Sequence, residues 1–122
     1  MIDLRSDTVT KPTNEMRKAM YDAELGDDVY GEDPTVNKLQ DLAAEITGKE
    51  AALLVSSGTM GNLVSLLTLT NRGEEIILGD QCHVYAWEGA GVPIFGGVSL
   101  NVTKNKNDGT LDLNDIKNAI NP

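Results

Sequence analysis

The chain has 122 residues, 40% of them hydrophobic, which is enough for one domain with a hydrophobic core. Its net charge of −9 argues against a nucleic-acid backbone or an anionic membrane as the main partner, although a local site can still bind a small anion. With one cysteine and one histidine, the sequence excludes an intrachain disulfide and a structural zinc site. The sequence has neither a signal-peptide core nor a long apolar run, and it therefore predicts a soluble, cytoplasmic protein.

The chain is predicted to begin with an arm and a short helix. Residues 1–12 are dense in hydroxyl groups and read as an extended arm, although a frayed terminus is the simpler interpretation of such a segment. Thr13 is a suitable N-cap for a helix that carries Met16 and Met20.

An acidic loop and a second helix are predicted next. Residues 24–33 contain five acids and two glycines, but acid-rich runs are usually solvated, so no metal site is predicted there. Tyr30 in this loop is either a core anchor or a contact residue. Asp33 is the expected N-cap of a helix that ends at Gly48.

A strand, a small-residue turn and a helix are predicted from residue 51 onward. Residues 51–55 form a short apolar run typical of a buried strand, and a longer apolar run at 63–69 is typical of a mostly buried helix. The turn between them contains Ser57, Gly58 and Thr59. A helix N-terminus offers unpaired N–H groups and a partial positive charge, so this turn is suited to cradle a phosphate or carboxylate. Because it matches neither the P-loop nor the dinucleotide fingerprint, an ordinary turn with an N-cap serine is the alternative.

The sole histidine follows the next predicted strand. Residues 75–78 form that strand, and His83 comes just after it, on a short helix that also carries Trp87 and Glu88. A lone histidine is more often structural, but open α/β sheets bind ligands at the carboxyl ends of their strands, which makes His83 a candidate site residue.

The last part of the chain contains one more strand and one more helix. Val98, Leu100 and Val102 alternate as in a strand, a polar turn follows, and Asp112 is placed to cap a final helix. Because strands and helices alternate, the predicted class is α/β with a mainly parallel sheet.

Four motifs, taken together, resemble one family. They lie at residues 4–10, at 26–35, at 57–62, and at His83 with Glu88. In this order they closely resemble the low-specificity L-threonine aldolases, which are pyridoxal-phosphate enzymes of the aspartate-aminotransferase-like fold (fold type I). The resemblance covers essentially the whole chain.

The resemblance assigns cofactor contacts to four residues. It implies that Ser57, Gly58 and Thr59 hold the phosphate of pyridoxal 5'-phosphate. It also implies that His83 stacks on the pyridine ring and is a candidate general base. The resemblance implies no metal.

The arm and the loop are assigned to the substrate and to a neighbouring subunit. The resemblance places Ser6 near the substrate carboxylate and directs Tyr30 toward the active site of a neighbouring subunit in a dimer or tetramer. Trp87 stands where some relatives have an aromatic hydroxyl. We therefore expect Val9, Val29 and Tyr30 to be poorly buried in a single chain.

The resemblance also predicts the architecture and its extent. It implies a three-layer α/β arrangement in which residues 1–122 form an N-terminal arm and an incomplete cofactor-binding large domain, without the small C-terminal domain. In the family, the Schiff-base lysine, the aspartate on the pyridine nitrogen and the arginine on the substrate carboxylate lie beyond residue 122. None of the seven lysines present matches that lysine, so the chain alone is predicted to be inactive.

The implied activity is cleavage of L-threonine or L-allo-threonine to glycine and acetaldehyde. The partners expected are an amino-acid substrate and further copies of the chain, with neither nucleic acid nor membrane. One alternative is another fold type I enzyme, such as a β-eliminating lyase or an aminotransferase. The other is a non-catalytic fragment that at most binds the phosphate.

Overall fold

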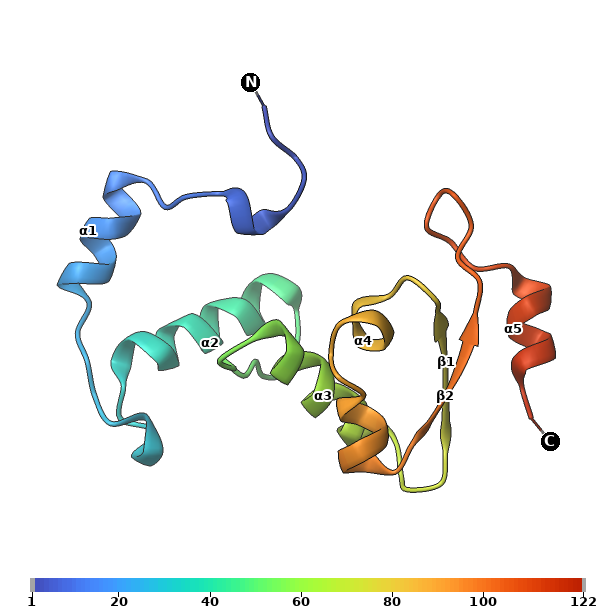
Figure 1. Cartoon of the computed structure of the whole chain (residues 1–122). Coiled ribbons are helices and arrows are strands. Elements are labelled where there is room, and N and C mark those ends of the chain that lie inside the picture. The colour runs from blue at the N-terminus through green and yellow to red at the C-terminus, as the bar shows by residue number, and fades with distance from the viewer. Residues whose placement is uncertain (1, 122) are drawn as a thin grey trace. The chain divides into compact units, whose positions relative to one another are not determined.

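The structure is a computed structural model that describes residues 2–121. The two end residues, with which the predicted arm begins and the predicted domain ends, lie outside this range. The chain divides into two compact units, Met1–Leu54 and Val55–Pro122, and each has its own internal contacts (Figure 1).

The first unit contains two α-helices and two short 3-10 helices. The helices are η1 (Asp7–Val9), α1 (Asn14–Asp22), η2 (Asp28–Tyr30) and α2 (Pro34–Thr47). Thr13 caps α1 as predicted, since its hydroxyl accepts a hydrogen bond from the Met16 N–H at 3.2 Å. The arm is not wholly extended, because the Ser6 hydroxyl accepts a bond from the Thr8 N–H and starts η1.

Asp33 joins the acidic loop to α2. Its side chain accepts hydrogen bonds from the N–H groups of Thr35 and Val36 at 2.9 Å and of Gly26 at 3.0 Å. The bond from Val36, followed by the bond from Gly26, holds the pKa of Asp33 below its usual value. The predicted N-cap is therefore confirmed, and the left-handed Gly48 ends α2 as expected.

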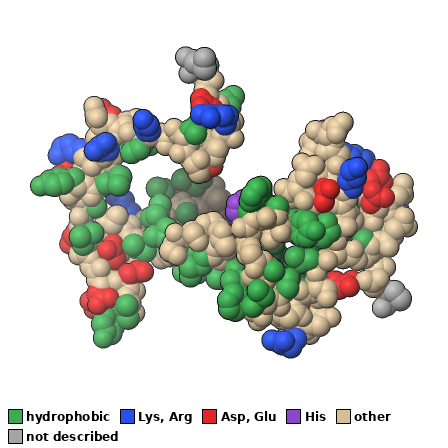
Figure 2. All heavy atoms as spheres, in the orientation of Figure 1, with side chains coloured by type: hydrophobic (Ala, Val, Ile, Leu, Met, Phe, Trp, Pro, Cys, Tyr) green, Lys and Arg blue, Asp and Glu red, His purple; other side chains and the backbone are tan. Residues whose placement is uncertain are grey.

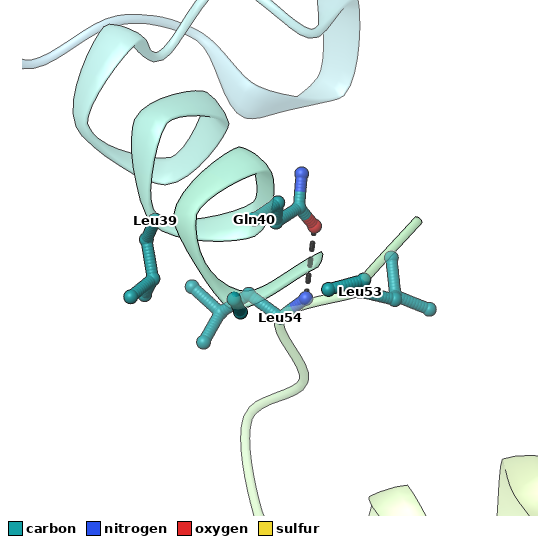
Figure 3. Close-up of a pocket in the computed structure, with 6 residues that line it drawn as sticks. Leu39, Gln40, Leu53 and Leu54 are labelled. Carbon is teal, nitrogen blue, oxygen red and sulfur yellow. Dashed lines mark hydrogen bonds between the residues drawn. The ribbon is translucent and has the colours of Figure 1, made fainter. Parts of the chain in front are cut away.

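The predicted strand at residues 51–55 is wrong. The segment is irregular, and its Leu53 and Leu54 side chains are exposed. The Leu54 N–H donates a hydrogen bond to Oε1 of Gln40 in α2 at 2.8 Å. Figure 3 draws this bond as a dashed line. A strand needs a neighbouring strand for its backbone groups, and none of the described residues pairs with this segment. A pocket of about 230 Å³ lies between it and α2, lined by Leu39, Gln40, Ala43, Ala52, Leu53 and Leu54.

The second unit contains a two-stranded parallel sheet and the helices beside it. In chain order the elements are α3 (Gly58–Leu69), β1 (Glu75–Gly79), α4 (His83–Ala86), the π-helical η3 (Val92–Gly96), β2 (Ser99–Thr103) and α5 (Leu113–Ala119). β1 pairs with β2 from Glu75↔Ser99 to Gly79↔Thr103, which confirms the predicted mixed α/β class with parallel strands. The three-layer arrangement stays a prediction.

The core of the second unit surrounds the sheet. Val92 and Val98 are each 2% exposed, and Leu78 of β1 is buried with them. α5 lies against β2, and α3 lies against η3. The prediction that Trp87 and Glu88 lie on the same helix as His83 is wrong. α4 is only one turn long, and both residues lie just beyond its end.

Large hydrophobic side chains remain exposed in both units, and Figure 2 shows such side chains gathered on the visible surface. Val9, Val29 and Tyr30 are 38%, 88% and 77% exposed, which confirms the expected poor burial of the arm and loop. Their contact with a neighbouring subunit stays a prediction. Among the described helices, none is both long and apolar enough to cross a bilayer.

The carboxyl end of β1 is held by the side chain of Asn105. Its Oδ1 accepts a hydrogen bond from the Gln81 N–H at 2.9 Å, and its Nδ2 donates to the Gly109 carbonyl at 3.1 Å. The Asn105 N–H donates to the Asp80 carboxylate at 2.9 Å. A side chain on the buried Gly79 would collide with this amide. The glycine therefore permits the close approach that closes the end of the sheet.

We predict that Gly79→Ala destabilises the chain by about 1–3 kcal/mol, because the added methyl must displace a hydrogen-bonded amide. The measurement is urea unfolding followed by circular dichroism. Gly58→Ala is the matched control, since a Cβ there meets no atom within 4 Å and the residue begins a helix. Equal unfolding midpoints for the two variants would contradict the prediction.

Candidate functional site

The first part of the candidate site is the N-terminus of α3. The hydroxyl of Ser57 accepts a hydrogen bond from the Met60 N–H at 3.1 Å, and its carbonyl accepts one from the Gly61 N–H at 3.0 Å. Gly58 and Thr59 are the first two residues of the twelve-residue helix. The predicted helix start is confirmed, although an irregular segment precedes it in place of a strand.

The free donors at this end of α3 are suited to an anion. Within residues 2–121, the N–H groups of Gly58 and Thr59 donate no hydrogen bond. Ser57, Gly58 and Thr59 are all exposed, and the glycine leaves open space beside the backbone. Two N–H groups, the Thr59 hydroxyl and the positive end of a helix dipole are the chemistry that binds phosphate.

The second part of the site is His83, the first residue of α4. It follows the carboxyl end of β1 by four residues, as predicted, and its side chain is 64% exposed. Its Nδ1 lies 2.8 Å from Oε1 of Glu88. The same Oε1 accepts a hydrogen bond from Nδ2 of Asn62 at 2.6 Å. Because Asn62 belongs to α3, the carboxylate joins His83 to the helix that begins at Gly58.

Glu88 is ionised in this arrangement. Burial of its carboxyl, whose side chain is only 3% exposed, is the largest single influence and by itself raises the pKa. The hydrogen bonds from His83 and Asn62 and the charge of His83 together outweigh burial, so the pKa of Glu88 lies below its ordinary value of 4.5. An ionised carboxylate only accepts hydrogen bonds, so Nδ1 of His83 is the donor.

The predicted substrate residues lie in the first unit. Ser6 caps η1, and its hydroxyl is 2.9 Å from that of Thr8. Tyr30 ends η2 and is exposed. Their contacts are local, and their roles toward a substrate or a neighbouring subunit stay predictions. The described residues contain no group of three or more metal-ligating side chains suited to an ion.

Sequence reasoning assigned no role to Asn62 or Glu88. Both belong to the motifs of the family resemblance, and Glu88 stands five residues after the sole histidine. That spacing was a usable signal, because the single turn of α4 and its C-cap Trp87 bring Glu88 back toward the His83 ring. The chain changes direction only after Glu88, where Gly89 and Ala90 are left-handed, with φ of 61° and 58°.

Comparison with known proteins identifies the family. The family model described as beta-eliminating lyase matches residues 3–122, and the chain belongs to this family. It is 53% identical to low-specificity L-threonine aldolase 1 of Arabidopsis thaliana over 120 residues. These aligned residues make up 98% of this chain and 34% of that protein. It is 51% identical over 122 residues to the low specificity L-threonine aldolase of Escherichia coli strain K12, covering 100% of this chain and 37% of that protein.

A further relative is an uncharacterized protein of Caenorhabditis elegans, 56% identical over 119 residues that make up 98% of this chain and 29% of the relative. The chain thus spans about a third of the length of these relatives. The resemblance to low-specificity L-threonine aldolases is confirmed over the whole chain.

The depressed pKa of Glu88 predicts a pH-dependent contribution to stability. A carboxyl whose pKa is lower in the folded than in the unfolded chain stabilises fully above the unfolded pKa, and the contribution is lost as pH falls through the folded pKa. We expect Glu88→Gln to lose less unfolding free energy than the wild type between about pH 7 and about pH 3. Chemical unfolding across this range measures it.

The control for this experiment is Glu45→Gln, which removes the charge of an exposed residue of α2. This variant should follow the wild-type dependence. An acid dependence of Glu88→Gln as steep as that of the wild type would show that the carboxylate gains nothing from His83 and Asn62.

Proposed function

We propose that this chain supplies the phosphate cradle and the ring-stacking histidine of a pyridoxal-phosphate-dependent aldehyde-lyase. The reaction is cleavage of L-threonine or L-allo-threonine to glycine and acetaldehyde. The observation that carries the proposal is the link from α3 to His83 through Glu88, because it couples the helix whose start is the proposed phosphate cradle to a hydrogen-bonded imidazole. The names of the aldolases of Arabidopsis thaliana and Escherichia coli support the choice of reaction.

The residues present fit the cofactor. The N–H groups of Gly58 and Thr59 and the hydroxyls of Ser57 and Thr59 would hold its phosphate at the start of α3. The exposed imidazole of His83 would cover a face of its ring. When bound, pyridoxal phosphate acts as the electron sink for carbon–carbon bond cleavage.

His83 is proposed to move a proton at Nε2. Because Nδ1 already donates its proton to Glu88, Nε2 carries the lone pair and is free to take the proton of the substrate β-hydroxyl. The burial of Glu88 keeps this carboxylate away from competing water. The hydrogen bond to Glu88 therefore favours the tautomer of His83 in which Nε2 is unprotonated and can act as a base.

The remaining roles follow the family resemblance. Ser6 is proposed to contact the substrate carboxylate, and Tyr30 to reach a neighbouring subunit of a homo-oligomer. The exposure of Tyr30 and Val29 supports the second role, since apolar side chains on a loop gain stability when a partner covers them. Residues 1–122 are proposed to be the arm and part of the large domain of a three-layer fold type I enzyme.

A β-eliminating lyase is the second candidate, favoured by the description of the matching family. The two activities differ in their products, because β-elimination releases ammonia and a 2-oxo acid, whereas the aldolase releases glycine and an aldehyde. The test is to express the complete reading frame of the gene with pyridoxal phosphate and to analyse the products from L-threonine. Glycine with acetaldehyde supports the proposal, and ammonia with a 2-oxo acid overturns it.

We predict that the start of α3 binds phosphate. Adding inorganic phosphate to the nitrogen-15-labelled chain should shift the backbone amide signals of Gly58 and Thr59. Thr59→Val should weaken binding about tenfold, because a hydrogen bond to a charged group is lost. Ser65→Ala, in the middle of α3 and exposed, is the control and should bind as the wild type does. Shifts spread evenly over the chain would reject the cradle.

We also predict that a polypeptide of only these 122 residues does not cleave threonine. The family resemblance implies that none of the seven lysines of this polypeptide is the lysine that forms the Schiff base. Covalent catalysis needs that nucleophile, and the loss of one residue of such a catalytic unit lowers the rate by several orders of magnitude. The polypeptide is incubated with pyridoxal phosphate, reduced with borohydride and weighed, and glycine is assayed. We expect scattered labelling or none, with no glycine above background. One adduct at a single lysine, together with glycine, would contradict the prediction.

A further inference from the structure

We propose that Glu88 is a positioning residue, which selects the tautomer of His83 and holds its ring in a fixed relation to α3. The inference deepens the proposed function and rests on it, because the role of His83 as a base belongs to that function. The observation is one carboxylate oxygen, Oε1 of Glu88, that accepts hydrogen bonds from Nδ1 of His83 at 2.8 Å and from Nδ2 of Asn62 at 2.6 Å.

The burial of the two partners differs in a way that suits this role. The Glu88 side chain is 3% exposed and the His83 side chain is 64% exposed. The carboxylate is therefore the fixed, enclosed end of the pair, while the imidazole faces the solvent. A carboxylate on Nδ1–H holds the neutral ring in the tautomer that leaves Nε2 unprotonated.

Asn62 holds the carboxylate in place. Its amide group does not titrate, so it donates to Glu88 whatever the pH. It lies on α3, five residues after the Ser57 N-cap. The segment after Glu88 packs on the same helix, where Leu63 lies 3.8 Å from the Cβ position of Gly91. The imidazole is thus oriented by the helix whose first turn is the proposed phosphate cradle.

Within residues 2–121, Glu88 is the only acid that forms an ion pair with His83. Asp80, near the end of β1, is engaged with the Asn105 N–H. Glu88 is therefore the carboxylate that selects the tautomer of His83.

The experiment measures the tautomer directly. Because His83 is the only histidine, ring-nitrogen-15 histidine gives signals from this residue alone. At a pH where the ring is neutral, the wild-type chain should be mainly in the Nδ1–H form. Glu88→Gln should move the ratio toward the Nε2–H form by about tenfold, because a charge-assisted hydrogen bond is lost. Asn62→Ala should give an intermediate ratio, and Glu45→Gln should leave the ratio unchanged.

Two outcomes would overturn the inference. One is a wild-type ring mainly in the Nε2–H form. The other is an unchanged ratio in Glu88→Gln, with the fold verified from the amide spectrum; if that variant fails to fold, an unchanged ratio in Asn62→Ala rejects the inference instead. Failure of phosphate binding or of glycine production, with the expected tautomer shifts, would reject the proposed function but not the positioning role of Glu88.

Discussion

The arrangement of the second unit depends on one buried carboxylate. Glu88 is enclosed, and a buried charge is costly unless polar partners compensate it. Asn62 and His83 provide that compensation, and they come from two elements, α3 and α4. Satisfying the carboxylate therefore requires α3 and the short α4 after β1 to come together. The chemistry of the candidate site and the packing of the unit follow from the same hydrogen bonds.

Two glycines near the sheet allow other parts of the second unit to approach the backbone closely. Gly79 lets the Asn105 amide bind at the carboxyl end of β1, and Gly96 lies against Leu67 of α3 with no room for a side chain. Gly79 is the last residue of β1, and Gly96 is the last residue of η3, within the crossover from β1 to β2 that also contains α4. A parallel pair needs such a crossover, and here the crossover itself carries His83 and Glu88.

The first unit is organised differently. Its order comes from side chains that bind nearby backbone, with Ser6, Thr13, Asp27 and Asp33 each starting a helix. Few of its apolar side chains are buried, and the irregular segment at its end has no strand partner among the described residues. Local hydrogen bonds can order short elements, but they do not create a core.

The sequence by itself determined the elements whose cause is local. The sequence predicted the caps Thr13, Asp33, Ser57 and Asp112 and the strand at 75–78, because capping and periodicity act within a few residues. It also predicted the last strand, in which Leu100 and Val102 lie, although Val98 comes one residue before that strand begins. Tertiary structure decided the rest. The apolar run at 51–55 is not a strand, because strand formation depends on a neighbour that hydrophobicity cannot supply. The shared bond of Glu88 to Asn62 and His83 joins residues 26 positions apart, and only folding brings them within hydrogen-bond distance.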